Sequence, residues 1–219
     1  GRGIAIGFWF NYGGQSSCTI NVNSDGTCGL VEGSPDIGGT RTSIAMQAAE
    51  ILGLPAEDFN PIVVDTDTVG FTEGTGGSRT TFATGWAAIE AARDVKSQMI
   101  ERAAQIWDID KETVYYENGF VKAPEHQMSF KELAAELGST GGLIVGKSTI
   151  TPAGEGGAFA GNIVDIKVDP ETGKIDILRF TAIQDVGTAI HPSYVEGQMQ
   201  GGSVQGIGWA LNEEYFMTD

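Results

Sequence analysis

Three glycine-rich segments constrain this chain more than any other feature, because each of them leads into a predicted helix. They are Gly38-Gly39-Thr40, the run from Gly74 to Arg79, and Asp185-Val186-Gly187, which is followed by Gln198. Glycine lets backbone N–H groups approach a ligand closely, and the first turn of a helix has unpaired N–H donors and a partial positive charge. The segments therefore indicate an anion-binding site built from backbone amides. The alternative is that these glycines serve tight turns and close packing.

The overall charge limits what kind of anion such a site can bind. Aspartate and glutamate number 29 against 13 lysines and arginines, a net charge of −16, and 32 of the 219 residues are glycine. Nucleic acids and anionic membrane surfaces bind basic faces, because counterion release drives that binding. We therefore expect neither as a partner. A small phosphate-bearing ligand remains compatible, and Arg79 in the first turn of its helix could add a bidentate contact to a phosphate.

Hydrophobic periodicity and turn residues predict an α+β fold. Strands are expected over residues 4–12, 18–23 and 28–32 as a meander, and over 61–65, 114–116, 120–122, 143–150, 158–168 and 174–184. Helices are expected over 40–52, 78–107, 129–137 and 193–213. Because the strands form hairpins rather than alternating with helices, we expect a two-layer arrangement of mixed or antiparallel sheets with helices packed on one side. We expect two domains, residues 1–150 and 151–219.

The segment from Gly141 to Ser148 fits the pattern of a phosphate-binding P-loop residue for residue. That site requires a strand before the loop and a helix that begins at Lys147-Ser148. Here a helix precedes the loop, and Leu143-Ile144-Val145 is typical of a buried strand. We therefore expect an ordinary strand in this place.

The cysteines and histidines predict neither a disulfide nor a metal site. Cys18 and Cys28 flank a hairpin turn but fall out of register across it. His126 and His191 lie far from both cysteines and from each other, so the spacing of a zinc site is absent.

The three glycine segments resemble the signatures of the molybdenum subunit in the xanthine dehydrogenase, aldehyde oxidase and carbon monoxide dehydrogenase family. The similar stretches, in the family's order and spacing, are Gly33 to Arg41 with Gln47 to Pro55, Asp65 to Asp67 with Gly74 to Thr81, and Asp185 to Pro192 with Gly197-Gln198 and Gly201-Gly202. The resemblance covers nearly the whole chain and corresponds to the C-terminal cofactor-binding region of such subunits.

The resemblance implies an oxidoreductase. Such subunits bind molybdopterin, in bacteria usually as the cytosine dinucleotide, and hydroxylate a substrate carbon with oxygen taken from water. Electrons leave through iron–sulfur clusters and often FAD on partner subunits or domains, and the two cysteines here are too few for a cluster. We expect part of a molybdenum hydroxylase for an aldehyde or N-heteroaromatic substrate. The alternative is a cofactor-free assembly chaperone or structural subunit of such a complex.

The resemblance also assigns the cofactor-binding residues, none of which is expected to bind a metal. They are Gly38, Gly39 and Thr40 at the pterin and pyrophosphate, Gly76, Gly77, Ser78, Arg79 and Thr80 at a phosphate or the nucleotide, and Asp185, Val186, Gly187, Thr188 and Gln198 at a third wall. Many members have Gly-Gln-Gly where this chain has Gly38-Gly39-Thr40, so a glutamine amide that would contact the cofactor is missing.

The family's catalytic glutamate lies after the third signature, and we expect it beyond Asp219. The chain is accordingly expected to be a piece of a longer subunit, inactive alone. Glu155 imitates the catalytic Gly-Glu segment but precedes the third signature, so we expect a loop carboxylate there. The expected partners are the rest of the molybdenum subunit, an iron–sulfur subunit, an FAD subunit and a small-molecule substrate. Members of the family are cytoplasmic or exported, and we expect the cytoplasm, with the periplasm as the alternative.

Overall fold

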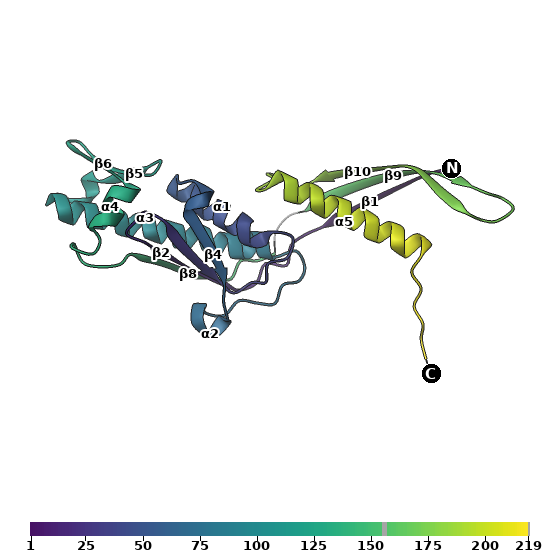
Figure 1. Ribbon diagram of the computed structural model, residues 1–219, viewed down its shortest axis with the longest axis horizontal. Coiled ribbons are helices and arrows are strands. Elements are labelled where there is room, and N and C mark those ends of the chain that lie inside the picture. The colour runs from purple at the N-terminus through teal and green to yellow at the C-terminus, as the bar shows by residue number, and fades with distance from the viewer. Residues whose placement is uncertain (155–156, 219) are drawn as a thin grey trace. The chain divides into compact units, whose positions relative to one another are not determined.

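The computed structural model describes residues 1–154 and 157–218, and the chain divides into two compact units (Figure 1). The terminal unit combines Gly1–Phe10 with Gly156–Asp219, and the central unit is Asn11–Glu155. The expected division at residue 150 therefore differs at the N-terminus, because the first ten residues belong with the C-terminal part of the chain. Both units combine helices with mixed or antiparallel sheets, which is the predicted α+β class.

A four-stranded mixed sheet organises the central unit. Its order is β4-β3-β2-β8, with β2 antiparallel to both β3 and β8 and with β3 parallel to β4. The strands are β2 (Ser16–Val22), β3 (Cys28–Glu32), β4 (Phe59–Val63) and β8 (Val145–Ile150). The P-loop-like segment thus contains a strand, as predicted. Cys18 and Cys28 are both free and buried, and Cys18 lies opposite Glu32 rather than opposite the other cysteine.

Two helices pack together and against this sheet, α1 (Thr40–Leu52) and α3 (Gly85–Trp107) (Figure 1). The α3 helix presents small residues to its neighbours, and Ala87, Ala91 and Val95 are fully buried. Gly146 on β8 permits this close approach, because a Cβ there would overlap the Ala91 carbonyl of α3. Together these elements bury the main apolar core.

Smaller elements complete the central unit. They are η1 (Ala56–Asp58), α2 (Thr66–Val69), the π-helical turn η2 (Thr80–Thr84), η3 (Lys111–Thr113), the sheet β5 (Tyr115–Glu117), β6 (Phe120–Ala123) and β7 (His126–Ser129), and α4 (Phe130–Glu136). The predicted turn at Asn118-Gly119 has positive φ at both residues. The predicted capping box joins Ser129 and Glu132. The predicted helix over 78–107 is interrupted at its start, where η2 precedes α3.

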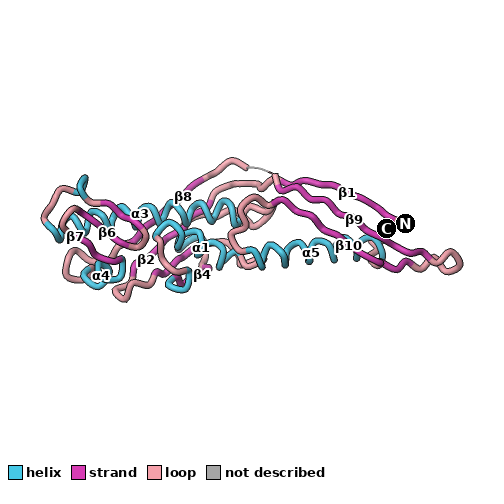
Figure 2. Tube along the Cα trace, turned by 90° about the horizontal axis from the view of Figure 1, so that it is seen from above, coloured by secondary structure: helices cyan, strands magenta, loops and turns pink. Residues whose placement is uncertain are grey.

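A three-stranded antiparallel sheet in the order β1-β9-β10 forms most of the terminal unit (Figure 2). Its strands are β1 (Arg2–Trp9), β9 (Ala158–Val168) and β10 (Ile175–Asp185), and the helix α5 (Pro192–Leu211) lies along it. The predicted opening meander is therefore wrong at its first strand, which pairs with β9 instead of β2. Gly13 and Gly14 do not close a hairpin, since the Gly14 amide donates to the Pro152 carbonyl. Among the described residues, no helix has the length and apolar character needed to cross a membrane.

Candidate functional site

The first two glycine segments meet in the central unit. The first leads into α1 and the second leads through η2 into α3, and these helices are neighbours. The Gln47 side-chain amide on α1 donates to the Thr81 carbonyl on η2 at 3.0 Å. The hydroxyl oxygens of Ser34 and Thr84 lie 2.8 Å apart. The fold therefore joins two segments that are some 40 residues apart in the sequence.

The first segment forms a loop between β3 and α1 whose backbone depends on glycine. Gly38 and Gly39 both have left-handed backbone, with φ of 68° and 78°. Gly39 is the N-cap of α1 and, together with Thr40, is half-buried, whereas Gly38 is exposed. The Asp36 carboxylate accepts a hydrogen bond from the Arg41 amide at 3.1 Å and so satisfies one donor of this helix terminus.

The second segment is an exposed loop that a ligand can approach along its backbone. A Cβ added at Gly74 or Gly76 would meet no atom within 4 Å. Gly77 and Ser78 both have a φ of 59°, and Arg79 returns to right-handed helical backbone. A left-handed residue followed by a right-handed one turns successive amides toward one concavity, which is an arrangement that binds anions. The anion contact at this loop stays a prediction.

Arg79 is the first residue of this segment that turns inward. It is fully buried, and its guanidinium donates to the carbonyls of Gly13, Glu73 and Gln15 at 2.5, 2.9 and 2.7 Å. It also donates to the Ser16 hydroxyl at 2.5 Å. Burial lowers the pKa of Arg79, while nearby Glu73 opposes that shift. The direct phosphate contact stays a prediction, and in this structure every guanidinium nitrogen donates to a protein oxygen.

Of the buried polar residues in this region, the sequence predicted Thr80 and missed Glu32. Thr80 is buried and its hydroxyl donates to that of Thr75 at 3.4 Å. Glu32, at the end of β3, is only 1% exposed, and burial raises the pKa of its carboxyl to about 7. The available signal was a glutamate at an inward position of an otherwise apolar strand, immediately before the first glycine segment.

The third segment lies in the terminal unit, so the structure describes it separately from the other two. Asp185 ends β10, and its carboxylate accepts the Gly187 amide at 2.9 Å. Asp185, Val186, Gly187 and Thr188 are exposed, and so is Gln198 on α5. His191 is the N-cap of α5 and stacks on Tyr194 at 3.7 Å between ring centroids.

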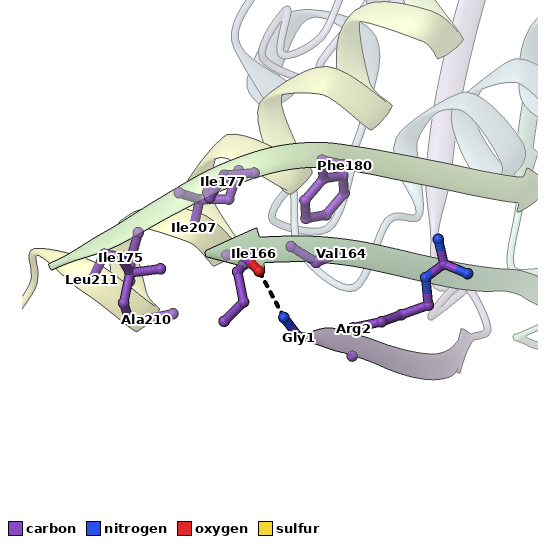
Figure 3. Close-up of a pocket in the computed structure, with 12 residues that line it drawn as sticks. Gly1, Arg2, Val164, Ile166, Ile175, Ile177, Phe180, Ile207, Ala210 and Leu211 are labelled. Atoms are coloured by element: carbon purple, nitrogen blue, oxygen red, sulfur yellow. Dashed lines mark hydrogen bonds between the residues drawn. The ribbon is translucent and has the colours of Figure 1, made fainter. Parts of the chain in front are cut away.

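An apolar pocket of about 540 Å³ in the terminal unit contains none of the predicted site residues (Figure 3). Its walls come from β1, β9, β10 and α5, and the N-terminal amine of Gly1 donates to the Ile166 carbonyl beside it at 2.7 Å. In the described part of the chain, no three His, Cys, Asp or Glu side chains gather closely enough to hold a metal ion. Glu155 lies outside the described residues.

Comparison with known proteins identifies relatives over the whole chain. A family model described as a molybdopterin cofactor-binding domain matches residues 1–219. A protein named "Probable hypoxanthine oxidase" from Escherichia coli (strain K12) is 31% identical over 208 residues, which cover 91% of this chain and 21% of that protein. The nicotine 6-hydroxylase large subunit of Paenarthrobacter nicotinovorans is 30% identical over 216 residues, covering 91% of this chain and 26% of the relative.

Solved structures share the fold over the full length. A crystal structure of the Cu,Mo-CO dehydrogenase in its carbon monoxide reduced state superposes with a TM-score of 0.89 at 26% identity, covering 100% of this chain and 30% of that one. The chain thus spans about a fifth to a third of the length of the relatives that it matches.

Proposed function

This chain belongs to the molybdopterin cofactor-binding domain family of the xanthine dehydrogenase and CO dehydrogenase type, and from that premise we propose that its glycine loops bind the phosphate-bearing part of the cofactor. The carrying observation is the exposed turn at Gly77-Ser78-Arg79, where left-handed backbone is followed by right-handed backbone, an arrangement that suits an anion. The open space at Gly74 and Gly76 leaves room for a ligand close to the backbone.

The residues present fit such a ligand through backbone donors rather than through exposed cations. In the central unit the proposed contacts are Gly38, Gly39, Thr40, Gly76, Gly77, Ser78 and Thr80, with Arg79 acting from beneath the loop. In the terminal unit they are Asp185, Val186, Gly187, Thr188 and Gln198. Backbone amides can bind a pyrophosphate without a basic surface, which agrees with a net charge of −16.

The bound group would supply redox chemistry, with molybdenum accepting the electrons released when a substrate carbon is hydroxylated. This chain's own residues would hold and orient the cofactor. We propose the cytosine dinucleotide form and an aldehyde or, favoured by the names of two relatives, an N-heteroaromatic substrate. We propose an iron–sulfur subunit and an FAD subunit as partners, and the cytoplasm as the location. Activity is proposed for the whole enzyme and not for this chain alone.

The deciding experiment is metal and nucleotide analysis of the full-length native complex, purified from a host that makes molybdopterin. Molybdenum close to one atom per chain, together with CMP released by acid hydrolysis, is the expected result. Molybdenum with AMP or with no nucleotide would retain the cofactor and reject the cytosine form. A folded protein with neither metal nor nucleotide would reject the proposal and favour the alternative of a chaperone or structural subunit, which the Gly39-Thr40 departure from the family's Gln-Gly makes conceivable.

A further inference from the structure

A chain of buried hydrogen bonds connects the first two glycine segments beneath their surface. It passes through side chains on β2, β3, η2 and the loops beside them. Its members are, in order, Arg79, Ser16, Thr84, Ser34 and Glu32, all of them buried. The successive distances are 2.5 Å from Arg79 Nη2 to Ser16 Oγ, 3.0 Å from there to Thr84 Oγ1, and 2.8 Å on to Ser34 Oγ.

The guanidinium of Arg79 can only donate. Its backbone acceptors are the carbonyl of Glu73, directly before the second segment, and those of Gly13 and Gln15. The Gly77 carbonyl in turn accepts the Tyr12 amide at 3.0 Å. Fixing Arg79 therefore fixes the base of the exposed loop from Gly74 to Ser78.

The glutamate end lies under the first segment. Glu32 Oε2 accepts the Ser34 amide at 2.5 Å, and its Oε1 is buried without a hydrogen-bond partner among the described residues. Burial disfavours the carboxylate form of Glu32 and raises its pKa, while the Ser34 amide and hydroxyl favour that form. The other groups that influence it are Asp36, which opposes ionisation, Arg41, which favours it, and the Cys18 thiol opposite it on β2.

Arginine cannot accept, so the Ser16 hydroxyl accepts from Arg79 and its own hydrogen is available to Thr84. Thr84 can in turn donate to Ser34, whose backbone amide donates to Glu32 Oε2. Hydrogen bonds aligned in one direction strengthen one another in a low-dielectric interior.

We propose that Arg79 and Glu32 are positioning residues at the two ends of this relay, which holds both glycine loops in the geometry that binds the cofactor. The statement that these loops bind the cofactor rests on the proposed function. The hydrogen bonds that connect the two loops do not depend on it. The relay makes the backbone of the first loop depend on a side chain in the second. A purely local role for either residue would not have that effect.

The test measures amide hydrogen-exchange protection in the full chain without added cofactor. Arg79→Lys keeps the charge but loses the planar fork, and Thr84→Val removes the central hydroxyl at nearly constant volume. We expect either change to lower protection in both loops, residues 33–39 and 74–80, by about tenfold or more, since each leaves a buried polar group unpaired. Arg93→Lys, at an exposed arginine that bonds to Glu90, is the matched control and should change neither loop.

Two results would overturn the relay. One is that Arg79→Lys alters residues 74–80 but leaves 33–39 at wild-type protection. The other is that the fold-losses of protection at residues 33–39 caused by Arg79→Lys and Thr84→Val multiply in the double variant. If both residues act through one relay, the second substitution should add little to the first. If the first variant does not fold, Thr84→Val and Ser34→Ala carry the same comparison across the middle of the chain.

The pH dependence of amide protection distinguishes a positioning role of Glu32 from a role in packing alone. Ionised Glu32 places a charge in a buried site where Oε1 has no partner among the described residues, so protection of residues 33–39 in the wild type should fall as pH rises through about 7. Glu32→Gln should abolish that dependence. A dependence that persists in Glu32→Gln would count against Glu32. These measurements need no cofactor, so they stand even if metal analysis rejects the proposed function. If the cofactor is present, Arg79→Lys should reduce the molybdenum retained per chain severalfold and Arg93→Lys should not.

Discussion

At the scale of single residues, Glu32 has the most unusual chemistry in the central unit. Its carboxyl is almost inaccessible, and burial raises its pKa from 4.5 to about 7. A carboxyl with a raised pKa in the folded state holds its proton more tightly than in the unfolded chain. Its contribution to stability is therefore complete below about pH 4.5 and is lost as pH rises toward 7.

We predict that Glu32→Gln removes this pH dependence. Between pH 4.5 and 7 the wild type should lose at most about 3.5 kcal/mol of unfolding free energy through this group, because one pKa unit corresponds to about 1.4 kcal/mol. Urea denaturation at half-unit pH steps measures the difference. Glu57→Gln, at an exposed residue, should follow the wild-type curve. Equal slopes for the wild type and Glu32→Gln would show that Glu32 titrates normally.

At the scale of elements, the packing of α3 on β8 depends on one glycine. A Cβ at Gly146 would overlap the Ala91 carbonyl and approach Val95 Cγ2 to 2.6 Å. Both neighbours belong to a rigid helix, so the strand must shift. We predict that Gly146→Ala destabilises the central unit by about 3 kcal/mol, as overpacking does in close-packed interiors.

The matched control is Gly29→Ala on β3 of the same sheet, where an added Cβ would meet no atom within 4 Å. Urea unfolding of both variants should show a loss for Gly146→Ala and little change for Gly29→Ala. Comparable losses would mean that strand glycines matter here through chain entropy, and the close approach to α3 would not be the cause.

Local sequence patterns predicted most helices and turns, because capping and turn residues determine where these elements begin and end. The helix Thr40–Leu52 ends at Gly53 in left-handed conformation, and the Asn118-Gly119 turn has the positive φ angles its sequence requires. The pairing of β1 with β9 could not be predicted in this way, because it joins residues about 160 positions apart. The burial of Arg79 could not be predicted from the sequence either, because its acceptors are backbone carbonyls, which every residue has.

The same distinction holds for the candidate site. The glycine segments could be found from composition and spacing, and their left-handed residues carry the geometry. The hydroxyl relay could not, because Ser16, Thr84 and Ser34 look like ordinary strand, helix and loop residues until tertiary packing brings them together.

At the scale of the whole molecule, stability is unevenly distributed between the two units. All buried members of the main apolar cluster lie between Cys18 and Ile144, within the central unit. In the terminal unit, every residue of β1 is exposed and α5 buries none of its residues. The α5 helix also contains Gly197, Gly201, Gly202, Gly206 and Gly208, each of which costs about 1 kcal/mol relative to alanine in a helix interior.

We predict that the isolated chain unfolds in two steps, with the terminal unit losing protection at lower urea than the central unit. Amide exchange at increasing urea concentration follows both units in one sample. Amides of β9 and β10 should report the first step, and those of β2 and α3 the second. A single coincident loss across both groups would show that the units unfold as one.

The hold on Arg79 by main-chain oxygens has a consequence for how this region can change over generations. A carbonyl is present whatever side chain its residue carries, so substitutions at Gly14 or Gln15 that keep the backbone in place do not remove the oxygens to which Arg79 donates. The arginine itself has no substitute of equal shape and donor number. We therefore expect substitutions to be tolerated at residues that contribute only a backbone carbonyl and not at Arg79. Among homologues, Arg79 should be constant while these acceptor residues vary.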